Sequence, residues 1–408
     1  MNLTRALMKT RLLLVTLLGL GLAAHTQNLL PNPGFEAGST QPSGWRLVDG
    51  PGQWATATSP GPGRVVRVRG EGEDQSVWRT ESLPLQPGGV YALRFRARRL
   101  SEASGGTAVA GTSRINRDFP LDFQWREYGF IFRQPDDASS DFVRLGQWHV
   151  RGEIEFDDAE LLPALASHRE FAEPAGSPPL QLGQNEHLTH DLYRFSLQLG
   201  GLAANLHRPL ERSTASFNSD RWVFSPGAQV VYRFALPGFR QTSAQVRVAI
   251  NHHVAGTLRV EASRDGHQWT SLGALGATDR AGNLILPAEL LPATECYLRL
   301  HTPDPDTALQ VNHCDYEAQI DPPAPYEAAG QTDFLEVNRG DPALVVNAFQ
   351  LDSRRGQGEI RLSLRAANTS SAPSQAASPC RAPPCAPPRP PPGPSGSNPA
   401  RKPTCACR

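Results

Sequence analysis

The segment that decides the fold is GVYALRFRARR, residues 89–99. Every second residue from Tyr91 to Ala97 is apolar, and arginines fill the alternate positions from Arg94 to Arg98. A period of two residues is typical of a β-strand that buries one face and exposes the other. We therefore expect a half-buried strand here, with its arginines directed toward solvent.

The same alternation recurs in short runs between Asn28 and Pro163, separated by glycine, proline, asparagine and aspartate. The clearest runs are RVVRVRG (64–70), REYGFIFRQP (126–135), DFVRLGQW (141–148) and GEIEFDDAEL (152–161). Several short strands with turn residues between them, and no convincing helix, indicate an antiparallel sandwich.

The rest of the chain repeats this pattern and predicts further β domains. A second β region covers residues 180–325, and an incomplete third β region covers 326–370. The stretch 164–179, which ends in prolines and a glycine, is the expected linker between the first two regions. With 408 residues, the chain exceeds what one hydrophobic core usually supports. The predicted fold class is therefore all-β, with tandem antiparallel jelly-roll β-sandwiches.

The N-terminal end differs from the body in composition. Residues 1–26 contain three positive charges and an apolar run from Leu12 to Ala24, which is the pattern of a secretory signal peptide. This run is too short for a stable membrane anchor, and no later run approaches the roughly 20 apolar residues of a transmembrane helix. We expect no membrane insertion, and a mature protein that is secreted, periplasmic or on the cell surface.

The C-terminal end differs as well. Residues 371–408 are rich in proline, lack acidic residues and hold four of the six cysteines. Such a segment cannot bury a core, which predicts a disordered tail. The abrupt change of composition within a β region equally fits translation in a shifted reading frame.

The charge of the body argues against a nucleic-acid partner. The formal net charge is zero, but the two ends contribute eight positive charges and no acidic residue. Without the ends, 32 Lys and Arg stand against 40 Asp and Glu. An acidic body repels a phosphate backbone.

Five elements of the N-terminal region occur in an order that resembles a known family. They are NLLPNPGFEAG (28–38), Gly44-Trp45, LPLQPGGVYALRFRAR (83–98), Trp125 before REYGFIFRQP, and GEIEFDDAELL (152–162). Over residues 27–163 they resemble the carbohydrate-binding modules of family 4/9 and their family 22 relatives. The resemblance implies a jelly roll that binds a polysaccharide or oligosaccharide, with a structural calcium ion where the first strand meets the last.

Three carboxylates are candidates for holding that calcium. Glu36 stands in the opening segment, and Asp157 and Asp158 stand in the closing one. A sandwich that pairs its terminal segments would bring these hard oxygen ligands together. The alternative is that Glu36 caps a turn and that Asp158 is only solvated.

Sugar recognition requires flat apolar rings with a few polar side chains beside them. Trp78, Trp148 and Gln147 lie where related modules place ligand contacts, and we expect them to bind the sugar. Trp54, in a loop flanked by glycine and proline, is a candidate for binding or for the core. Two further tryptophans occupy packing positions of the family, which predicts burial: Trp45 and Trp125.

The second region resembles, through LRVEASRDGHQWTSLG (258–273), the galactose-binding-like domains typified by discoidin and the coagulation factor 5/8 C-type domain. This likeness implies a sandwich and identifies no ligand. Cys296 and Cys314 flank an expected hairpin with its turn at TPDPDT (302–307). Alternation puts the two cysteines on opposite faces, so a disulfide between them would need a bulge.

The sequence contains no recognisable catalytic pattern. His187 and His190 have HxxH spacing without the glutamate of zinc proteases, and nucleophile-elbow, phosphate-loop and dinucleotide motifs are absent. We therefore expect a secreted, non-catalytic carbohydrate-binding protein. Two alternatives stay open: the ancillary part of a glycoside hydrolase that lacks its catalytic module, and a structural or adhesive surface protein.

Overall fold

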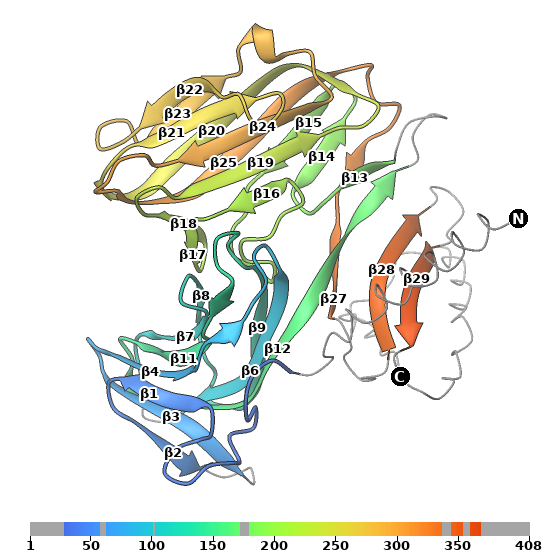
Figure 1. The fold of residues 1–408 in the computed structure, drawn as a ribbon. Helices are drawn as coiled ribbons and strands as arrows, with labels where there is room; N and C mark the ends of the chain where they lie inside the picture. The colour runs from blue at the N-terminus through green and yellow to red at the C-terminus, as the bar shows by residue number, and fades with distance from the viewer. Residues whose placement is uncertain are drawn as a thin grey trace, which may run out of the picture. The chain divides into compact units, whose positions relative to one another are not determined.

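The computed structural model describes residues 28–57, 63–100, 103–171, 179–336, 344–353 and 360–368. Strands dominate these residues, beside one short 3-10 helix, η1 (Ala288–Leu290), and the prediction of an all-β fold is confirmed (Figure 1). The chain divides into two compact units, Met1–Thr369 and Ser370–Arg408, and every described residue belongs to the first. The predicted signal peptide and disordered tail, with its frame-shift interpretation, lie outside the described residues.

The N-terminal sandwich consists of two sheets. One sheet has the strand order β1 (Trp45–Asp49), β4 (Gln75–Thr80), β11 (Arg144–Trp148), β7 (Thr107–Gly111) and β8 (Ile115–Phe119). The other has the order β2 (Gly52–Thr56), β3 (Arg64–Glu71), β12 (Arg151–Phe171), β6 (Val90–Arg99) and β9 (Arg126–Arg133). A separate pair contains β5 (Leu83–Pro84) and β10 (Ser140–Asp141). The chain passes repeatedly between the two sheets, as in a jelly roll.

The strand expected over residues 89–99 is β6, and its apolar face is buried as predicted. Leu93 and Phe95 have no exposed surface. Arg98 departs from the prediction, because it is only 6% exposed instead of facing solvent. Its guanidinium donates to the buried carboxylate of Glu155 on β12 at 2.7 and 2.9 Å. Alternation alone could not show this burial, since the partner lies 57 residues away in the sequence.

Strand β12 is long, and its second half occupies the first part of the predicted linker. It runs without interruption from Arg151 to Phe171, so the expected linker 164–179 is strand over residues 164–171. Its first half pairs with β3 and β6, and its second half pairs with β27 (Thr332–Glu336) and β13 (Leu180–Leu182). The prolines and the glycine that suggested a linker all follow Phe171. Pairing with two later strands therefore keeps residues 164–171 extended.

A second sandwich follows β13. One sheet has the order β17 (Ser216–Asn218), β18 (Arg221–Phe224), β25 (Ala308–Asp321), β15 (Leu192–Ser196), β14 (Glu186–Thr189) and β26 (Ala328–Ala329), with β20 (Arg240–Ala255) and β23 (Ala281–Ile285) beyond β25. The other has the order β16 (Leu210–Ser213), β19 (Gln229–Ala235), β24 (Glu295–His301), β21 (Leu258–Ser263) and β22 (Thr270–Leu275). Since β17 pairs in parallel with β8, one sheet continues from the first sandwich into the second.

The hairpin predicted around TPDPDT (302–307) is not formed. The flanking strands belong to different sheets, because β24 pairs with β19 and β21 whereas β25 pairs with β15, β18 and β20. Cys296 and Cys314 are both buried and both free. The segment is a crossing between sheets, which alternation within the flanking strands cannot distinguish from a hairpin turn.

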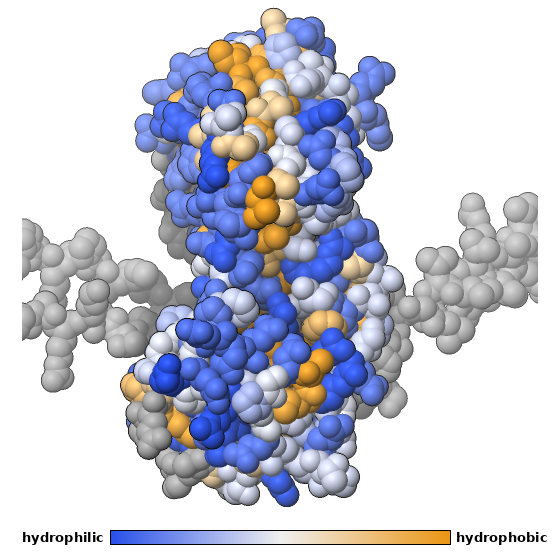
Figure 2. Space-filling model, turned by 90° about the vertical axis from the view of Figure 1, so that its left-hand side faces the viewer, coloured by the Kyte–Doolittle hydropathy of each residue, from blue (hydrophilic) through white to orange (hydrophobic). Residues whose placement is uncertain are grey.

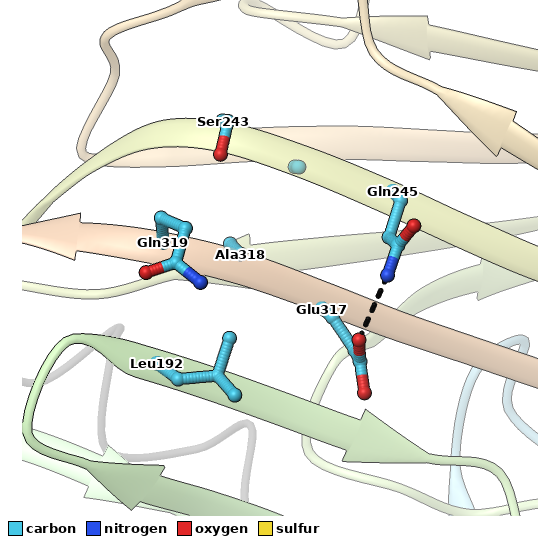
Figure 3. Close-up of a pocket in the computed structure, with 7 residues that line it drawn as sticks. Leu192, Ser243, Gln245, Glu317, Ala318 and Gln319 are labelled. Carbon is cyan, nitrogen blue, oxygen red and sulfur yellow. Dashed lines mark hydrogen bonds between the residues drawn. The ribbon is translucent and has the colours of Figure 1, made fainter.

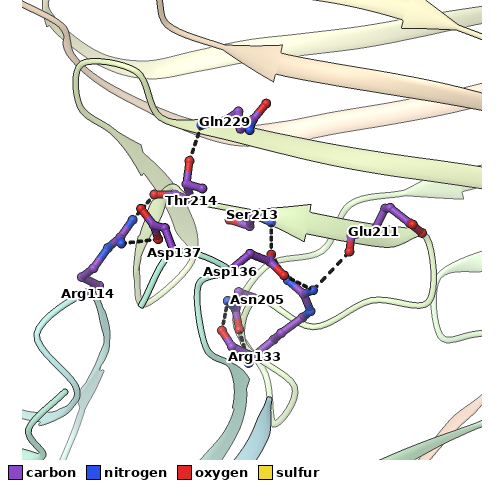
Figure 4. A network of polar contacts seen from close by, with 9 residues as sticks. All are labelled: Arg114, Arg133, Asp136, Asp137, Asn205, Glu211, Ser213, Thr214 and Gln229. Carbon is purple, nitrogen blue, oxygen red and sulfur yellow. Dashed lines mark hydrogen bonds and ion pairs between the residues drawn. The ribbon is translucent and has the colours of Figure 1, made fainter. Parts of the chain in front are cut away.

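A polar network joins the two sandwiches (Figure 4). Arg133, at the end of β9, forms an ion pair with Asp136 at 2.6 Å, and Asp136 accepts a hydrogen bond from the N–H of Ser213 at 2.6 Å. Asn205 bonds both the N–H and the carbonyl of Arg133, at 2.9 Å each. Backbone groups take part in these bonds, which makes the contact geometrically specific. The same network contains Arg114, Asp137, Glu211, Thr214 and Gln229.

The incomplete third β region is divided among several sheets. Strands β26 and β27 join sheets already described, and β28 (Leu344–Ser353) pairs with β29 (Ile360–Asn368).

No helix in the described part of the chain is long and apolar enough to cross a membrane. Figure 2 shows one side of the molecule, where apolar side chains gather in a band on the second sandwich and in smaller patches on the N-terminal one.

Candidate functional site

The seven tryptophans all lie in the described ranges, and they differ widely in exposure. Trp148 is 49% exposed, whereas Trp45, Trp78 and Trp222 are 3% exposed or less. The other three are partly buried, and each has an arginine guanidinium within 4.8 Å of its ring centre: Trp54, Trp125 and Trp269. Trp148 is therefore the most exposed of the seven tryptophans.

The ring of Trp148 is held by a turn that follows β11. His149 stacks on it, with the ring centres 4.3 Å apart and the planes inclined by 15°. The buried amide of Gln147 accepts a hydrogen bond from the N–H of Val150 at 2.8 Å, and its Nε2 lies 3.3 Å from Asp74 Oδ1. The N–H of His149 donates to the carbonyl of Asp74 at 2.9 Å. These bonds hold the backbone of the turn from which the two stacked rings project.

Two of the predicted sugar contacts are buried, which corrects their expected role. Trp78 is 3% exposed, and its Nε1 donates to the carbonyl of Arg67 at 3.0 Å, so its ring packs in the core. Its side chain points into the sandwich, as do those of Leu47 and Leu145, its cross-strand neighbours. Gln147 is 1% exposed and holds the turn beside Trp148 instead of facing a ligand.

Trp54 lies between the two roles that the sequence left open. It is partly buried on β2, and its Nε1 donates to the carbonyl of Phe35 at 2.7 Å. The guanidinium of Arg64 covers its ring at 4.1 Å. The predicted burial of Trp45 is confirmed at 1% exposure, and Trp125 is partly buried.

The outer face of the sheet β1-β4-β11-β7-β8 carries a row of arginines that the sequence did not reveal. Arg46, Arg79 and Arg144 are direct cross-strand neighbours, and therefore share one face. The next position of the row is Gly111 on β7. Trp148 lies on the same face, four residues from Arg144 and thus about 13 Å along β11. Charged donors and the exposed ring therefore occupy one surface.

A row of small and apolar residues separates the arginines from Trp148. It contains Val77, Gly146 and Val109 as neighbours on β4, β11 and β7. A Cβ on Gly146 would lie 2.4 Å from the carbonyl oxygen of Ser76, which excludes a larger residue without rearrangement. Two carboxylates stand at the ends of this row, on β1 and β8: Asp49 and Asp118.

The opposite outer face of the same sandwich has a different arrangement of charges. Glu155 on β12 lies between Arg67 on β3 and Arg98 on β6. Its Oε1 is 2.5 Å from Arg67 Nη2, and its Oε2 is 2.7 Å from Arg98 Nη2. The ring of Trp125 covers Arg98 at 4.8 Å. Guanidinium, carboxylate and guanidinium thus form a closed, internally bonded set.

The opening segment contacts the closing strand, as predicted for a sandwich that pairs its ends. The side-chain oxygen of Asn28 accepts a hydrogen bond from the N–H of Leu161 at 2.9 Å. The carbonyl of Pro33 accepts one from the N–H of Ala159 at 2.8 Å. Because these bonds tie the two segments together, Glu36 is brought close enough to Asp157 to act on its charge.

The three predicted calcium ligands gather at this edge. The pKa of Asp157 is raised to about 6, chiefly by burial and further by the negative charges of Asp158 and Glu36. One oxygen of each carboxylate is already bonded: Glu36 to the N–H of Arg64 at 2.9 Å, Asp157 to the N–H of Asp158 at 2.8 Å, and Asp158 to Arg96 at 3.1 Å.

These carboxylates suit calcium by chemical type, because calcium prefers oxygen ligands. Their geometry is incomplete, since within the described ranges no group of three or more His, Cys, Asp or Glu is arranged to hold a metal ion. Calcium binding would therefore require the carboxylates to reorient or backbone oxygens to contribute.

The second sandwich also has a depression, on its outer face between β15, β25 and β20, with a volume of about 170 Å³ (Figure 3). Its polar groups bond mainly to one another. Gln245 donates to Glu317 at 2.9 Å, and Arg194 pairs with the other oxygen of Glu317 at 2.9 Å. None of the described residues that line it is aromatic. It therefore lacks a ring on which a sugar could stack.

No protein-family model matches the sequence, and no curated protein matches it significantly. The chain is similar to solved structures that include carbohydrate-binding modules of families 4, 16, 22 and 61. The tandem CBM22-1–CBM22-2 domain of Paenibacillus barcinonensis Xyn10C covers 73% of this chain and 99% of its own, at 12% identity and a TM-score of 0.28. A CBM61 in complex with β-1,4-galactotriose covers 34% of this chain and 99% of its own, at 18% identity and a TM-score of 0.27.

Parts of enzymes are among the similar structures too. The enzymatically active domain of bacteriophage CBA120 tailspike protein 4 covers 33% of this chain and 21% of its own, at 13% identity and a TM-score of 0.27. The present chain thus matches about a fifth of that structure. Identities and TM-scores this low identify neither a ligand nor an activity.

Proposed function

We propose that the N-terminal sandwich binds a carbohydrate on the outer face of its β1-β4-β11-β7-β8 sheet. Trp148 supplies the ring on which a sugar stacks, and polar side chains of the same face bond to the hydroxyl groups. The span of about 13 Å between Arg144 and Trp148 suits an oligosaccharide or polysaccharide better than a single sugar.

The observation that carries this proposal is the exposed, stacked pair of Trp148 and His149. Leaving a tryptophan ring in water forgoes about 25 cal/mol for each Å² of apolar surface that burial would remove. Here the turn that carries the ring is held by the buried amide of Gln147. A flat ring exposed on the face of a sheet supplies the apolar surface on which a sugar ring stacks.

The proposal is tested by glycan-array binding and affinity electrophoresis with the full chain. We expect Trp148→Ala to lower the affinity at least about tenfold, because truncation removes the stacking surface. Phe123→Ala is the matched control, since Phe123 is also exposed, at 52%, and lies outside the proposed face. A folded Trp148→Ala protein that binds like the wild type, or a wild type that binds no glycan, would show the proposal to be wrong.

We also propose that calcium binds at Glu36, Asp157 and Asp158 and links the opening and closing segments. The support is the gathering of three oxygen ligands and the raised pKa of Asp157. An ion bound only by the native state raises the free energy of unfolding, by about 2.7 kcal/mol at one hundred times its Kd. Calcium should therefore raise the melting temperature above that in chelator, and Asp157→Asn should abolish the difference. Equal melting temperatures of the wild type with and without calcium would exclude the ion.

We further propose that the protein is exported and holds its glycan without cleaving it. The composition of residues 1–26 supports export, and N-terminal sequencing of protein from the culture medium would locate the cleavage. Incubation with a bound polysaccharide should produce no new reducing ends. The appearance of such ends would instead favour an enzyme or a part of one.

A further inference from the structure

The row Arg46, Arg79 and Arg144 places three like charges side by side on neighbouring strands. Like charges directly opposite one another destabilise a sheet. None of the three forms an ion pair or a side-chain hydrogen bond with the residues that the structure describes, and the Nε atoms of Arg79 and Arg144 are buried without an acceptor. Buried donors are normally bonded, so this row has an unmet demand for acceptor oxygens.

The row on the opposite face shows how neighbouring guanidinium groups obtain an acceptor. There the central position is Glu155, whose carboxylate bonds to Arg67 and Arg98 on its two sides. In the row on β1, β4 and β11 the central position is Arg79. The comparison indicates that an anion is needed at the centre of the second row and that the chain does not place one there.

The nearest carboxylates do not fill this place. Asp141, Asp118 and Asp49 favour the charged form of Arg144 through space, without a hydrogen bond to it. Burial outweighs them and lowers the pKa of Arg144. The Oδ1 atom of Asp141 accepts hydrogen bonds from backbone N–H groups, and its Oδ2 atom is buried without a hydrogen-bond partner and bonds to none of the three arginines. The guanidinium groups are therefore only partly compensated.

The central arginine of the row is oriented without a hydrogen bond. The guanidinium of Arg79 lies over the ring of Phe142 at 4.7 Å, which orients it without using its N–H groups. A planar guanidinium with free N–H groups matches carboxylate and sulfate oxygens in a two-pronged contact.

We propose that the glycan bound by the N-terminal sandwich is acidic, with a carboxylate or sulfate group on Arg79 between Arg46 and Arg144 while another sugar ring stacks on Trp148. This inference rests on the proposed function and adds the chemical class of the ligand. A uronic acid carboxylate and a sulfate ester present the same anionic oxygens. Either group would place anionic oxygens beside Arg79, as the carboxylate of Glu155 lies between Arg67 and Arg98 on the opposite face.

Two pairs of polymers with a shared backbone test the inference with the full chain. They are carboxymethyl cellulose against hydroxyethyl cellulose, and dextran sulfate against dextran. We expect affinity electrophoresis to show at least tenfold tighter retention by one acidic polymer than by its neutral counterpart. The difference should shrink as salt is added, because salt screens the charges. The pair that shows it distinguishes carboxylate from sulfate.

Variants of the central arginine sharpen the test. Arg79→Gln should weaken retention by the acidic polymer about tenfold to one hundredfold, since a charge-assisted bond is lost. Arg79→Glu puts a carboxylate between Arg46 and Arg144, as on the opposite face, and should abolish retention while the melting temperature is kept. Arg280→Glu, at an exposed arginine of the second sandwich, makes the same change of net charge and should bind like the wild type.

Three outcomes would contradict one or both of the proposals, which are carbohydrate binding and an acidic ligand. Equal or tighter retention by the neutral polymers overturns the acidic ligand and leaves carbohydrate binding in place. A loss as large in Arg280→Glu as in Arg79→Glu also overturns it, because that result reports net charge alone. If the folded wild type retains none of the four polymers and no glycan of an array, both proposals are wrong.

Discussion

The two outer faces of the N-terminal sandwich use the same residue types to opposite effect. Across β3, β12 and β6 the row reads Arg67, Glu155 and Arg98, and the carboxylate is bonded on both sides. Across β1, β4 and β11 three arginines stand in a row with no carboxylate between them. The first face is complete within the chain, whereas the second needs an acceptor from outside. The central residue of a charged row thus decides whether the row is structural or open to a ligand.

The largest expected effect comes from removing the central carboxylate. Glu155→Ala removes the buried carboxylate that bonds to both Arg67 and Arg98, and breaking a buried ion pair costs about 3 to 5 kcal/mol. Arg79→Ala, at the central position of the other face, should cost less than about 1 kcal/mol because like-charge repulsion is relieved as packing is lost. Urea unfolding compares the two variants. Equal losses would mean that the two rows are energetically alike.

The next comparison is between two tryptophans of the sheet β1-β4-β11-β7-β8. Trp78 packs in the core beneath this sheet, and Trp148 lies on its outer face. Trp78→Ala should lower the free energy of unfolding by about 3 kcal/mol, since it opens a cavity in the core. Trp148→Ala should change it by less than about 0.5 kcal/mol, since the ring is half exposed. Chemical denaturation measures both. A Trp148→Ala protein as unstable as Trp78→Ala would assign Trp148 to the core and remove the binding face.

A smaller effect is expected at the turn that presents Trp148. Gln147→Met keeps the side-chain volume but removes the acceptor of Val150 N–H, and an unsatisfied buried N–H costs about 1 to 2 kcal/mol. Glycan affinity should fall severalfold as the ring loses its fixed direction. Gln245→Met, in the depression of the second sandwich, is the matched control and should bind normally. Unchanged affinity in Gln147→Met would show that the turn does not depend on this amide.

The smallest effect concerns Asp157, near the edge of the closed face. Its folded-state pKa is raised from 3.8 to about 6, so the folded protein keeps a proton that the unfolded chain has lost. In chelator, the free energy of unfolding should therefore fall as the pH rises from about 4 to about 6. Because Asp157 is partly exposed, the slope is a fraction of roughly 1.4 kcal/mol per pH unit.

Urea titrations at several pH values measure this slope, and Asp157→Asn should flatten it. Saturating calcium should reverse the trend in the wild type, since the metal binds the deprotonated carboxylates. The same slope in Asp157→Asn as in the wild type would contradict the assignment to this carboxyl group.

The strands could be predicted from the sequence because alternation is a local property. GVYALRFRARR became β6, with Tyr91, Leu93, Phe95 and Ala97 in the core, and GEIEFDDAEL became part of β12 with its apolar residues inward. The pairing between strands that are distant in the sequence cannot be predicted from the residue pattern of either strand. The crossing at 302–307 resembled a hairpin, and residues 164–171 resembled a linker until β27 and β13 supplied their partners.

The site could be predicted only in part for the same reason. Trp148 lies in a clearly alternating run, whereas QSVWRT around Trp78 has too little alternation to show which side faces the core. The arginine row was invisible, because Arg46, Arg79 and Arg144 come from three separate segments that meet only through the pairing of β1, β4 and β11. Knowledge of that pairing would have been sufficient to find it.

Strand β12 has a mechanical consequence. A polymer gripped by the N-terminal sandwich and pulled would load a single covalent strand that passes from β3 and β6 to β27 and β13 without an intervening loop. The hydrogen bonds along β12 run across the strand, so tension along its axis acts on many of them in shear at once. Force on a tethered glycan would thus be shared along a ladder of bonds before any one of them opens.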